Sequence, residues 1–254
     1  MTRRHTKAGR VVMQRQAYIG TSGWTYDAWK ADFYADVPRR AWLTHYARHF
    51  RAVEVNATFY HQPKQSTLAG WLEKTPPDFR FALKGHRYLT HVMKLEVPLE
   101  TFVRQQQAAA ALGGRLAAIV WQLPAGLKRD LPRLERFARL LDTWQATRHA
   151  LEFRDPSWFD EATAACLCRH CLAACQSDSA DWPLWNAVTT DIVYVRLHGN
   201  RITYCSPYTQ PELLGWAKRT RLWLAQGRDV HIYFDNTDAG HAPRDAQRLA
   251  RMLA

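Results

Sequence analysis

The sequence predicts a single α/β domain with the architecture of a TIM-type (β/α)8 barrel. Short apolar runs recur about eight times along the 254-residue chain, and an amphipathic stretch follows nearly every run. No Asn-Gly or Asp-Gly dipeptide joins neighbouring runs, although tight hairpins favour such dipeptides. This order is typical of parallel strands joined by crossover helices. Barrels of this kind run to about 250 residues, which is the length of this chain.

The expected strands are the apolar runs that end in polar or charged residues. They are Ala17–Trp24, Ala52–Tyr60, Phe79–Lys84, Leu116–Leu123, His149–Arg154, Leu172–Asp178, Ile192–His198 and Val230–Asn236. Side chains alternate along a strand, and the face beneath the helices must stay apolar. The residues expected on that outer face are Val53, Val55, Phe153, Val195, Leu197, Ile232 and Phe234. The opposite face, which becomes the barrel interior, then holds Glu54, Asn56, Glu152, Arg154, Arg196, His198 and Asp235.

Seven helices fit the intervening stretches. They are Arg39–Phe50, Ser66–Thr75, Leu99–Leu112, Leu131–Trp144, Asp160–Leu172, Gln210–Gln226 and Ala242–Leu253. Pro132, Pro211 and Pro243 fall in first turns, where a missing N–H costs little. Gly113–Gly114 and Gly227 fall where helices end. The stretch Asp181–Thr190 is short and contains a proline, so we expect an irregular connection between strands six and seven.

Composition indicates a globular protein of the cytoplasm. The chain is 47% hydrophobic and has no apolar run of the roughly 18 residues that span a bilayer, so we expect no membrane association. Its five cysteines form no even framework, which favours reduced thiols. The net charge is +12, and residues 1–16, which include Arg3, Arg4, Lys7 and Arg10, are interpreted as a disordered basic leader before a domain at 17–254, with Met13 as an alternative start. The remaining excess favours anionic partners.

Several motifs resemble those of the DUF72 or YecE-like proteins. They are GTSGW (Gly20–Trp24), VEVNATFYHQP (Val53–Pro63), TPPDFRFALK (Thr75–Lys84), LTH (Leu89–His91), QLP (Gln122–Pro124), EFRDPSW (Glu152–Trp158), YVRLHG (Tyr194–Gly199) and YFDNTDAGHAPRDA (Tyr233–Ala246). The resemblance implies a TIM-type barrel and no particular reaction, since the family has no established one. This chain has Asp235 where similar proteins usually show the first Asn of YFNN, and its basic run after the Thr-His pair is reduced to His91–Lys94.

In barrels of this type the chemistry lies at the carboxyl ends of the strands. The residues that this rule places around one mouth are Trp24, Glu54, Asn56, Tyr60, Lys84, His91, Gln122, Glu152, Arg154, Trp158, Asp178, Arg196, His198, Asp235 and Asn236. We expect Glu54, Glu152 and His198 to transfer protons. The remaining twelve would contact the ligand, with Arg154 and Arg196 gripping an anionic group.

These assignments predict an enzyme, a hydrolase or an isomerase, that acts on an anionic or polyhydroxylated small molecule without a cofactor. Mutual neutralisation of the carboxylates and cations is an equally good interpretation of either Glu. For Trp158, packing of a loop on the core competes with ligand stacking.

Two other functions remain open. A noncatalytic module that binds nucleic acid or another polyanion would use the basic surface. A divalent-metal isomerase or hydrolase would use Glu152, Asp178, His198 and Asp235 as ligands. The cysteines Cys168, Cys171 and Cys175 read CxxCxxxC, but their place on a helix and the next strand favours a role in the core.

Overall fold

The computed structural model describes residues 15–254. The predicted leader therefore lies almost wholly outside the described residues, as does Met13. Its last two residues contact Asp229, with Arg15 Nη1 3.0 Å from Oδ2 and the Gln16 N–H donating to Oδ1 at 3.2 Å. None of the helices in the described part is long and apolar enough to cross a membrane.

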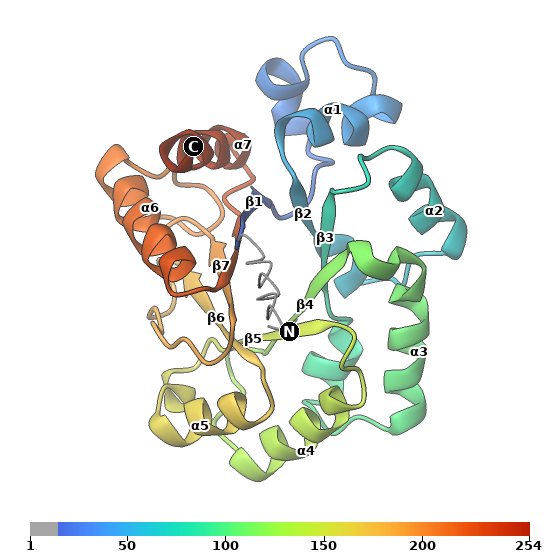
Figure 1. Ribbon diagram of the computed structural model, residues 1–254, viewed down its shortest axis with the longest axis vertical. Helices are drawn as coiled ribbons and strands as arrows, with labels where there is room; N and C mark the ends of the chain where they lie inside the picture. The colour runs from blue at the N-terminus through green and yellow to red at the C-terminus, as the bar shows by residue number, and fades with distance from the viewer. Residues whose placement is uncertain (1–14) are drawn as a thin grey trace, which may run out of the picture.

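Eight parallel strands form the centre of the molecule, as the sequence predicts (Figure 1). They are β1 (Ala17–Thr21), β2 (Ala52–Val55), β3 (Arg80–Lys84), β4 (Leu116–Gln122), β5 (Arg148–Glu152), β6 (Ala173–Asp178), β7 (Ile192–Leu197) and β8 (Asp229–Phe234). Neighbours along the chain pair from β2 to β8, and β8 pairs in turn with β1. The strands therefore curve into a nearly closed barrel.

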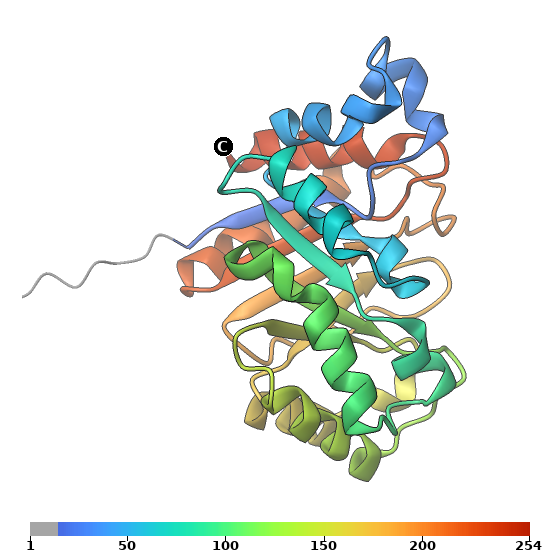
Figure 2. The ribbon, with the colours of Figure 1, turned by 90° about the vertical axis from the view of Figure 1, so that its right-hand side faces the viewer.

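Seven α-helices surround the strands (Figure 2). They are α1 (Trp42–His49), α2 (Gln65–Glu73), α3 (Leu99–Ala109), α4 (Leu131–Asp142), α5 (Glu161–Arg169), α6 (Gln210–Ala225) and α7 (His241–Leu253). No helix lies between β6 and β7, which confirms the predicted irregular connection. Pro132 and Pro211 lie in first turns, and Asp130 caps α4 by accepting from the Arg133 N–H at 3.0 Å.

Alternation along the strands assigns the two faces as predicted. The outward side chains join the main hydrophobic core beneath the helices. Inside the barrel, before the charged residues at the strand ends, the inward side chains form a separate hydrophobic cluster. Strands β2 to β6 contribute mostly alanine to it, whereas β7 and β8 contribute Tyr194 and Tyr233. Large rings on one side thus fill the space that small residues leave on the other, and they support the charged residues above.

The seam between β1 and β2 is closed by a side chain. The Tyr46 hydroxyl accepts from the Thr21 N–H at 2.9 Å and donates to the Ala52 carbonyl at 3.1 Å. A Cβ on Gly20 would lie 2.1 Å from that carbonyl oxygen, so only glycine permits this approach. Past the seam the Gly23 N–H donates to the Glu54 carbonyl at 2.7 Å, which joins the two strands directly at the mouth.

Several strands end earlier than predicted. β2 stops at Val55, and Asn56–Phe59 forms a 3-10 turn. The Thr58 hydroxyl lies 2.7 Å from both the Val55 and Lys84 carbonyls. A side-chain hydrogen bond thus replaces the backbone bonds of the strand where the chain turns. The extended pattern of the sequence does not reveal this turn.

Candidate functional site at the barrel mouth

A buried arginine organises the carboxyl end of the barrel. Arg196 faces inward from β7 and has no exposed surface. Its Nε lies 3.0 Å from both carboxylate oxygens of Glu54, and its Nη1 donates to Glu152 at 2.7 Å. Its Nη2 donates to Glu54 at 2.8 Å and to Asp235 at 2.9 Å. One guanidinium therefore links strands β2, β5, β7 and β8.

Hydroxyl groups complete the shell of Glu54. Ser22 and Tyr194 each donate to one carboxylate oxygen at 2.6 Å. Glu54 is wholly buried, so all its partners belong to the protein. The prediction that Glu54 transfers protons to a ligand does not fit this arrangement, because Arg196 and the hydroxyls surround it. Its carboxylate holds β1, β2 and β7 together.

His198 lies between two other carboxylates. Its Nε2 is 3.2 Å from Glu152 and its Nδ1 is 3.0 Å from Asp235. The Ser177 hydroxyl donates to Glu152 at 2.9 Å. His198 and Glu152 have no exposed surface, so they act beneath the reachable layer of the mouth.

Charge pairing outweighs burial in this network. Burial raises the pKa of Glu152, but Arg196 and Arg154 lower it, and it lies well below its ordinary value. Burial also raises the pKa of Asp235, whereas Arg196 and His198 bring it down to about 2. Burial would lower the pKa of Arg196, but the three carboxylates raise it well above its ordinary value. Glu152, Asp235 and Arg196 are therefore charged near neutral pH.

Two cations above the network have free N–H groups. Lys84 is half-buried, its ammonium lies 4.2 Å from the centre of the Phe59 ring, and it has no ion pair among residues 15–254. Burial and Arg196 lower the pKa of Lys84 to about 8. Arg154 donates from Nε to Glu152 at 3.3 Å, and its Nη1 has no protein partner in the described chain. These two side chains are the reachable positive charges of the mouth.

Three aromatic or imidazole rings frame the two cations. Arg154 stacks 4.0 Å above Trp182, which donates from Nε1 to Ser177 at 2.9 Å. Tyr204 lies edge-on to His198, with ring centres 5.6 Å apart. Burial, Lys84 and other nearby cations lower the pKa of His91 to about 4, so this imidazole is neutral near pH 7.

Four contributors to the site escaped the sequence reasoning: Ser22, Ser177, Tyr194 and Trp182. The alternation that places Arg196 on the inward face of β7 also places Tyr194 there, two residues before it. Ser177 lies two residues after Cys175, which faces inward, so it faces inward too. Trp182 lies in the irregular connection, where no periodicity marks it.

Three predicted ligand contacts do not reach the mouth. Asp178 faces outward, because Cys175 and Ser177 face inward and side chains alternate along β6. On that outer side it accepts a hydrogen bond from Tyr208. Asn236 also faces outward and donates to Asp245 on α7 at 3.0 Å. Trp158 is buried and donates to the Leu127 carbonyl at 2.7 Å, so it anchors a loop.

The other predicted contacts are divided between the mouth and its rim. Asn56 lies over the network, donating to Asp235 and accepting from Arg196, both at 3.3 Å. Gln122 is in register with inward-facing Glu152. Trp24 packs edge-on against Trp71, with ring centres 5.4 Å apart, and Tyr60 is 60% exposed. The N–H groups of Arg196 face protein acceptors, so the direct ligand contact predicted for it does not fit this arrangement.

The predicted metal ligands do not converge. Asp178 points away, and the Arg196 guanidinium contacts Glu152 and Asp235 from the centre of the mouth. A different group brings three possible ligand atoms within 4.8 Å of one another in the described residues, namely Glu135, Cys166 and His170 between α4 and α5. The cysteines of the CxxCxxxC pattern are dispersed, since Cys168 and Cys171 are exposed while Cys175 lies inside the barrel.

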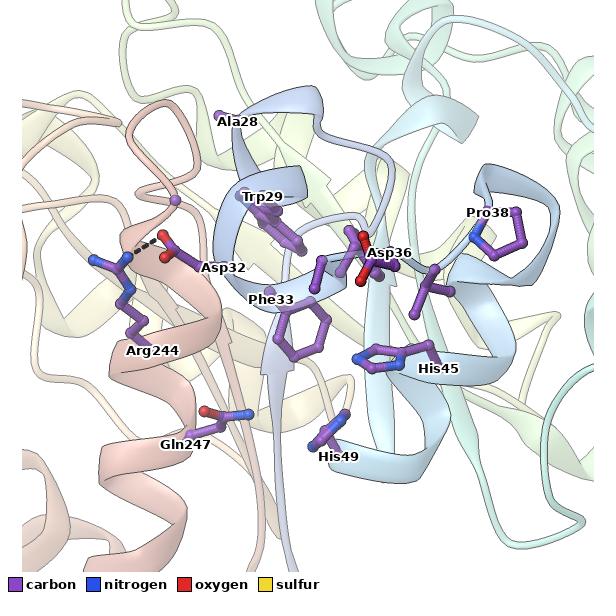
Figure 3. Close-up of a pocket in the computed structure, with 14 residues that line it drawn as sticks. Ala28, Trp29, Asp32, Phe33, Asp36, Pro38, His45, His49, Arg244 and Gln247 are labelled. Carbon is purple, nitrogen blue, oxygen red and sulfur yellow. Dashed lines mark hydrogen bonds and ion pairs between the residues drawn. The ribbon is translucent and has the colours of Figure 1, made fainter.

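A separate cavity of about 730 Å³ lies outside the barrel (Figure 3). Phe33, His45 and His49 line one side, and Arg244 and Gln247 of α7 line the other. The ion pair of Asp32 with Arg244 is more than half exposed, and the lining is mostly apolar. The mouth, unlike this cavity, holds buried charges within hydrogen-bonding distance, so we place the candidate site there.

Fold and site together define a TIM-type barrel with a buried charge network beneath two reachable cations. The family model of DUF72, a protein family of unknown function, matches residues 18–254. The chain belongs to the DUF72 family.

Several known proteins are similar to this chain. UPF0759 protein YunF of Bacillus subtilis is 23% identical over 93% of this chain and 94% of its own length. UPF0759 protein YecE of Escherichia coli is 31% identical over 56% of this chain and 50% of its own length. A solved DUF72 protein of Thermotoga maritima has a TM-score of 0.79 at 28% identity, covering 93% of this chain and 98% of that one. One from Enterococcus faecalis reaches 0.80 at 18% identity, covering 94% and 95%.

Proposed function

We propose that the protein is an enzyme that acts on an anionic small molecule at the barrel mouth. The observation that carries this proposal is the pair of reachable cations, Lys84 and Arg154, which keep free N–H groups above the buried network. Three carboxylates outnumber Arg196 in that network, so Lys84 and Arg154 also balance its charge. Among residues 15–254, however, the Lys84 ammonium has no carboxylate within 4.0 Å and the Arg154 Nη1 has no hydrogen-bond acceptor. The oxygens of a bound anion would supply these acceptors.

Arg154 is the anion-binding residue in this proposal. Its Nε is held by Glu152 and its plane rests on Trp182, so the guanidinium is positioned before the ligand arrives. Its free Nη1 can then donate to a carboxylate or phosphate oxygen. Prior positioning reduces the entropy lost on binding.

Lys84 is the group that transfers protons. A general acid or base works best when its pKa lies near the operating pH, and the Lys84 pKa of about 8 meets that condition. Glu152 and His198, predicted to move protons directly, are wholly buried beneath Lys84 and Arg154. We therefore assign the proton transfer to the reachable lysine.

A thermal-shift comparison tests the proposal. The panel contains sugar phosphates and 2-oxo acids, each beside a neutral sugar of similar size. We expect at least one anionic compound to raise the melting temperature of the wild type and of Arg104→Met, an exposed control on α3. The effect should be lost in Arg154→Met. A shift that survives in Arg154→Met would overturn the assignment of the site.

A further inference from the structure

Lys84 differs from every other lysine of the described chain. Lys30, Lys64, Lys74, Lys94, Lys128 and Lys218 are all exposed. Lys84 is the last residue of β3, and its side chain enters the mouth. The Thr58 hydroxyl donates to its carbonyl at 2.7 Å, which fixes the backbone from which the amine projects.

The surroundings of Lys84 favour a free amine. Its ammonium lies over the Phe59 ring and not beside a carboxylate, and the guanidinium of Arg196 repels it. With a pKa of about 8, roughly one molecule in ten carries the uncharged amine at pH 7. Uncharged amines are nucleophiles, and a lysine whose pKa is lowered by burial can attack carbonyl carbons.

Arg154 lies where it can orient such a carbonyl compound. It lies two residues after β5, and Gln122 of β4 lies between β5 and β3 in the strand order. Lys84 and Arg154 both act on the pKa of His91, so both border the same part of the mouth. An anionic group on Arg154 would leave the rest of a small ligand facing Lys84.

We propose that Lys84 condenses with the carbonyl group of an anionic oxo-compound, such as a 2-oxo acid or a phosphorylated ketose, to form an imine. This inference rests on the proposed function, since it uses the same mouth and the same anion-binding Arg154. It names a substrate class and a covalent step that the proposed function does not require.

The step balances without a co-reactant. The amine nitrogen attacks the carbonyl carbon, the C–O double bond is replaced by a C–N double bond, and the oxygen leaves as water. Starting from the ammonium, the products are the protonated imine and one water, with no net change in protons. The protonated imine withdraws electrons from the neighbouring carbon, which assists proton removal or bond cleavage there.

Reductive trapping tests the inference on the intact protein. Pyruvate and dihydroxyacetone phosphate are each added with sodium cyanoborohydride, and the modified lysines are identified by peptide mass mapping. We expect at least one of the two to label Lys84 at least tenfold faster than any of the six exposed lysines. Labelling of Lys84 no faster than the exposed lysines, with both compounds, would overturn the inference.

Two variants separate the covalent step from anion binding. Lys84→Arg keeps the charge and should abolish labelling at that peptide while the exposed lysines react as before. Arg154→Met should slow labelling by the effective anionic probe at least tenfold but leave labelling by neutral propanal unchanged. If anionic compounds raise the melting temperature through Arg154 but Lys84 is not trapped, the imine is refuted and the proposed function stands. If neither effect occurs, both are refuted.

Discussion

Arg196 and Glu54, 142 residues apart in sequence, meet across the barrel with the Arg196 Nε 3.0 Å from both carboxylate oxygens. Neither side chain has exposed surface. The pair joins β7 to β2, strands that do not neighbour each other in the sheet order. The inward charge that attracts attention in the sequence is therefore partly a structural tie.

Replacing Arg196 should be strongly destabilising. Arg196→Met leaves Glu54, Glu152 and Asp235 buried without their common cation, which typically costs about 3–5 kcal/mol when one partner of a buried pair is removed. Urea unfolding of the variant and of Arg104→Met, the exposed control, measures the effect. A loss below about 1 kcal/mol in Arg196→Met would show that the network does not hold the barrel together.

Replacing Asp235 should be milder. Asp235→Asn keeps the size of the side chain and removes its charge, and Arg196 keeps two carboxylates. One charge-assisted hydrogen bond is lost, at about 1.5–3 kcal/mol near pH 7. The folded pKa of about 2 lies below the ordinary value, so the Asp235 contribution is present above about pH 4 and is lost as pH falls towards 2. Unfolding measured from pH 7 to pH 2 should show the two proteins converging; a constant difference would contradict this.

The Lys84 pKa can be measured directly. ¹³C-methylated lysines titrated by NMR should show one resonance, absent in Lys84→Arg, with a pKa of about 8. Glu152→Gln should lower that value further, because Glu152 raises it. A Lys84 resonance that titrates near the ordinary 10.4 would contradict the proposed acid–base role.

His170 should stabilise the protein in a pH-dependent way. Burial lowers the pKa of His170, but Glu135 and Asp142 raise it to a net value above normal. A raised folded pKa gives stability that is complete below the unfolded pKa and lost as pH rises through the folded one. His170→Gln should therefore cost about 1 kcal/mol or less at pH 5.5 and less at pH 9. Exposed His61→Gln serves as the control, and a larger loss at pH 9 would contradict the sign.

The seam between β1 and β2 gives a test of packing. Gly20→Ala brings a methyl group against the Ala52 carbonyl and the Tyr46 hydroxyl, and we expect a loss of about 1–3 kcal/mol. Gly70→Ala on α2 meets nothing within 4 Å and should be neutral or stabilising. Equal melting temperatures for both variants would show that the seam tolerates widening.

Strand alternation explains what the sequence revealed and what it did not. Charged residues alternate with apolar ones at the end of β7, and this pattern predicts that Arg196 and His198 face inward. The sixth strand, AACQSD, lacks that contrast, so Asp178 was taken for an inward residue in place of Ser177. Trp182 and the pairing across the barrel depend on three-dimensional closure, which no local pattern records. Lys84 and Arg154 were among the predicted residues, but only the three-dimensional contacts show that both keep free N–H groups while those of Arg196 are all taken by protein acceptors.

A crystal structure of the protein with its most stabilising anionic compound tests the central claim most directly. Ligand density between Lys84 and Arg154 at the barrel mouth is the predicted result. Density confined to the cavity of Phe33, His45 and His49, with the mouth unoccupied, would contradict it.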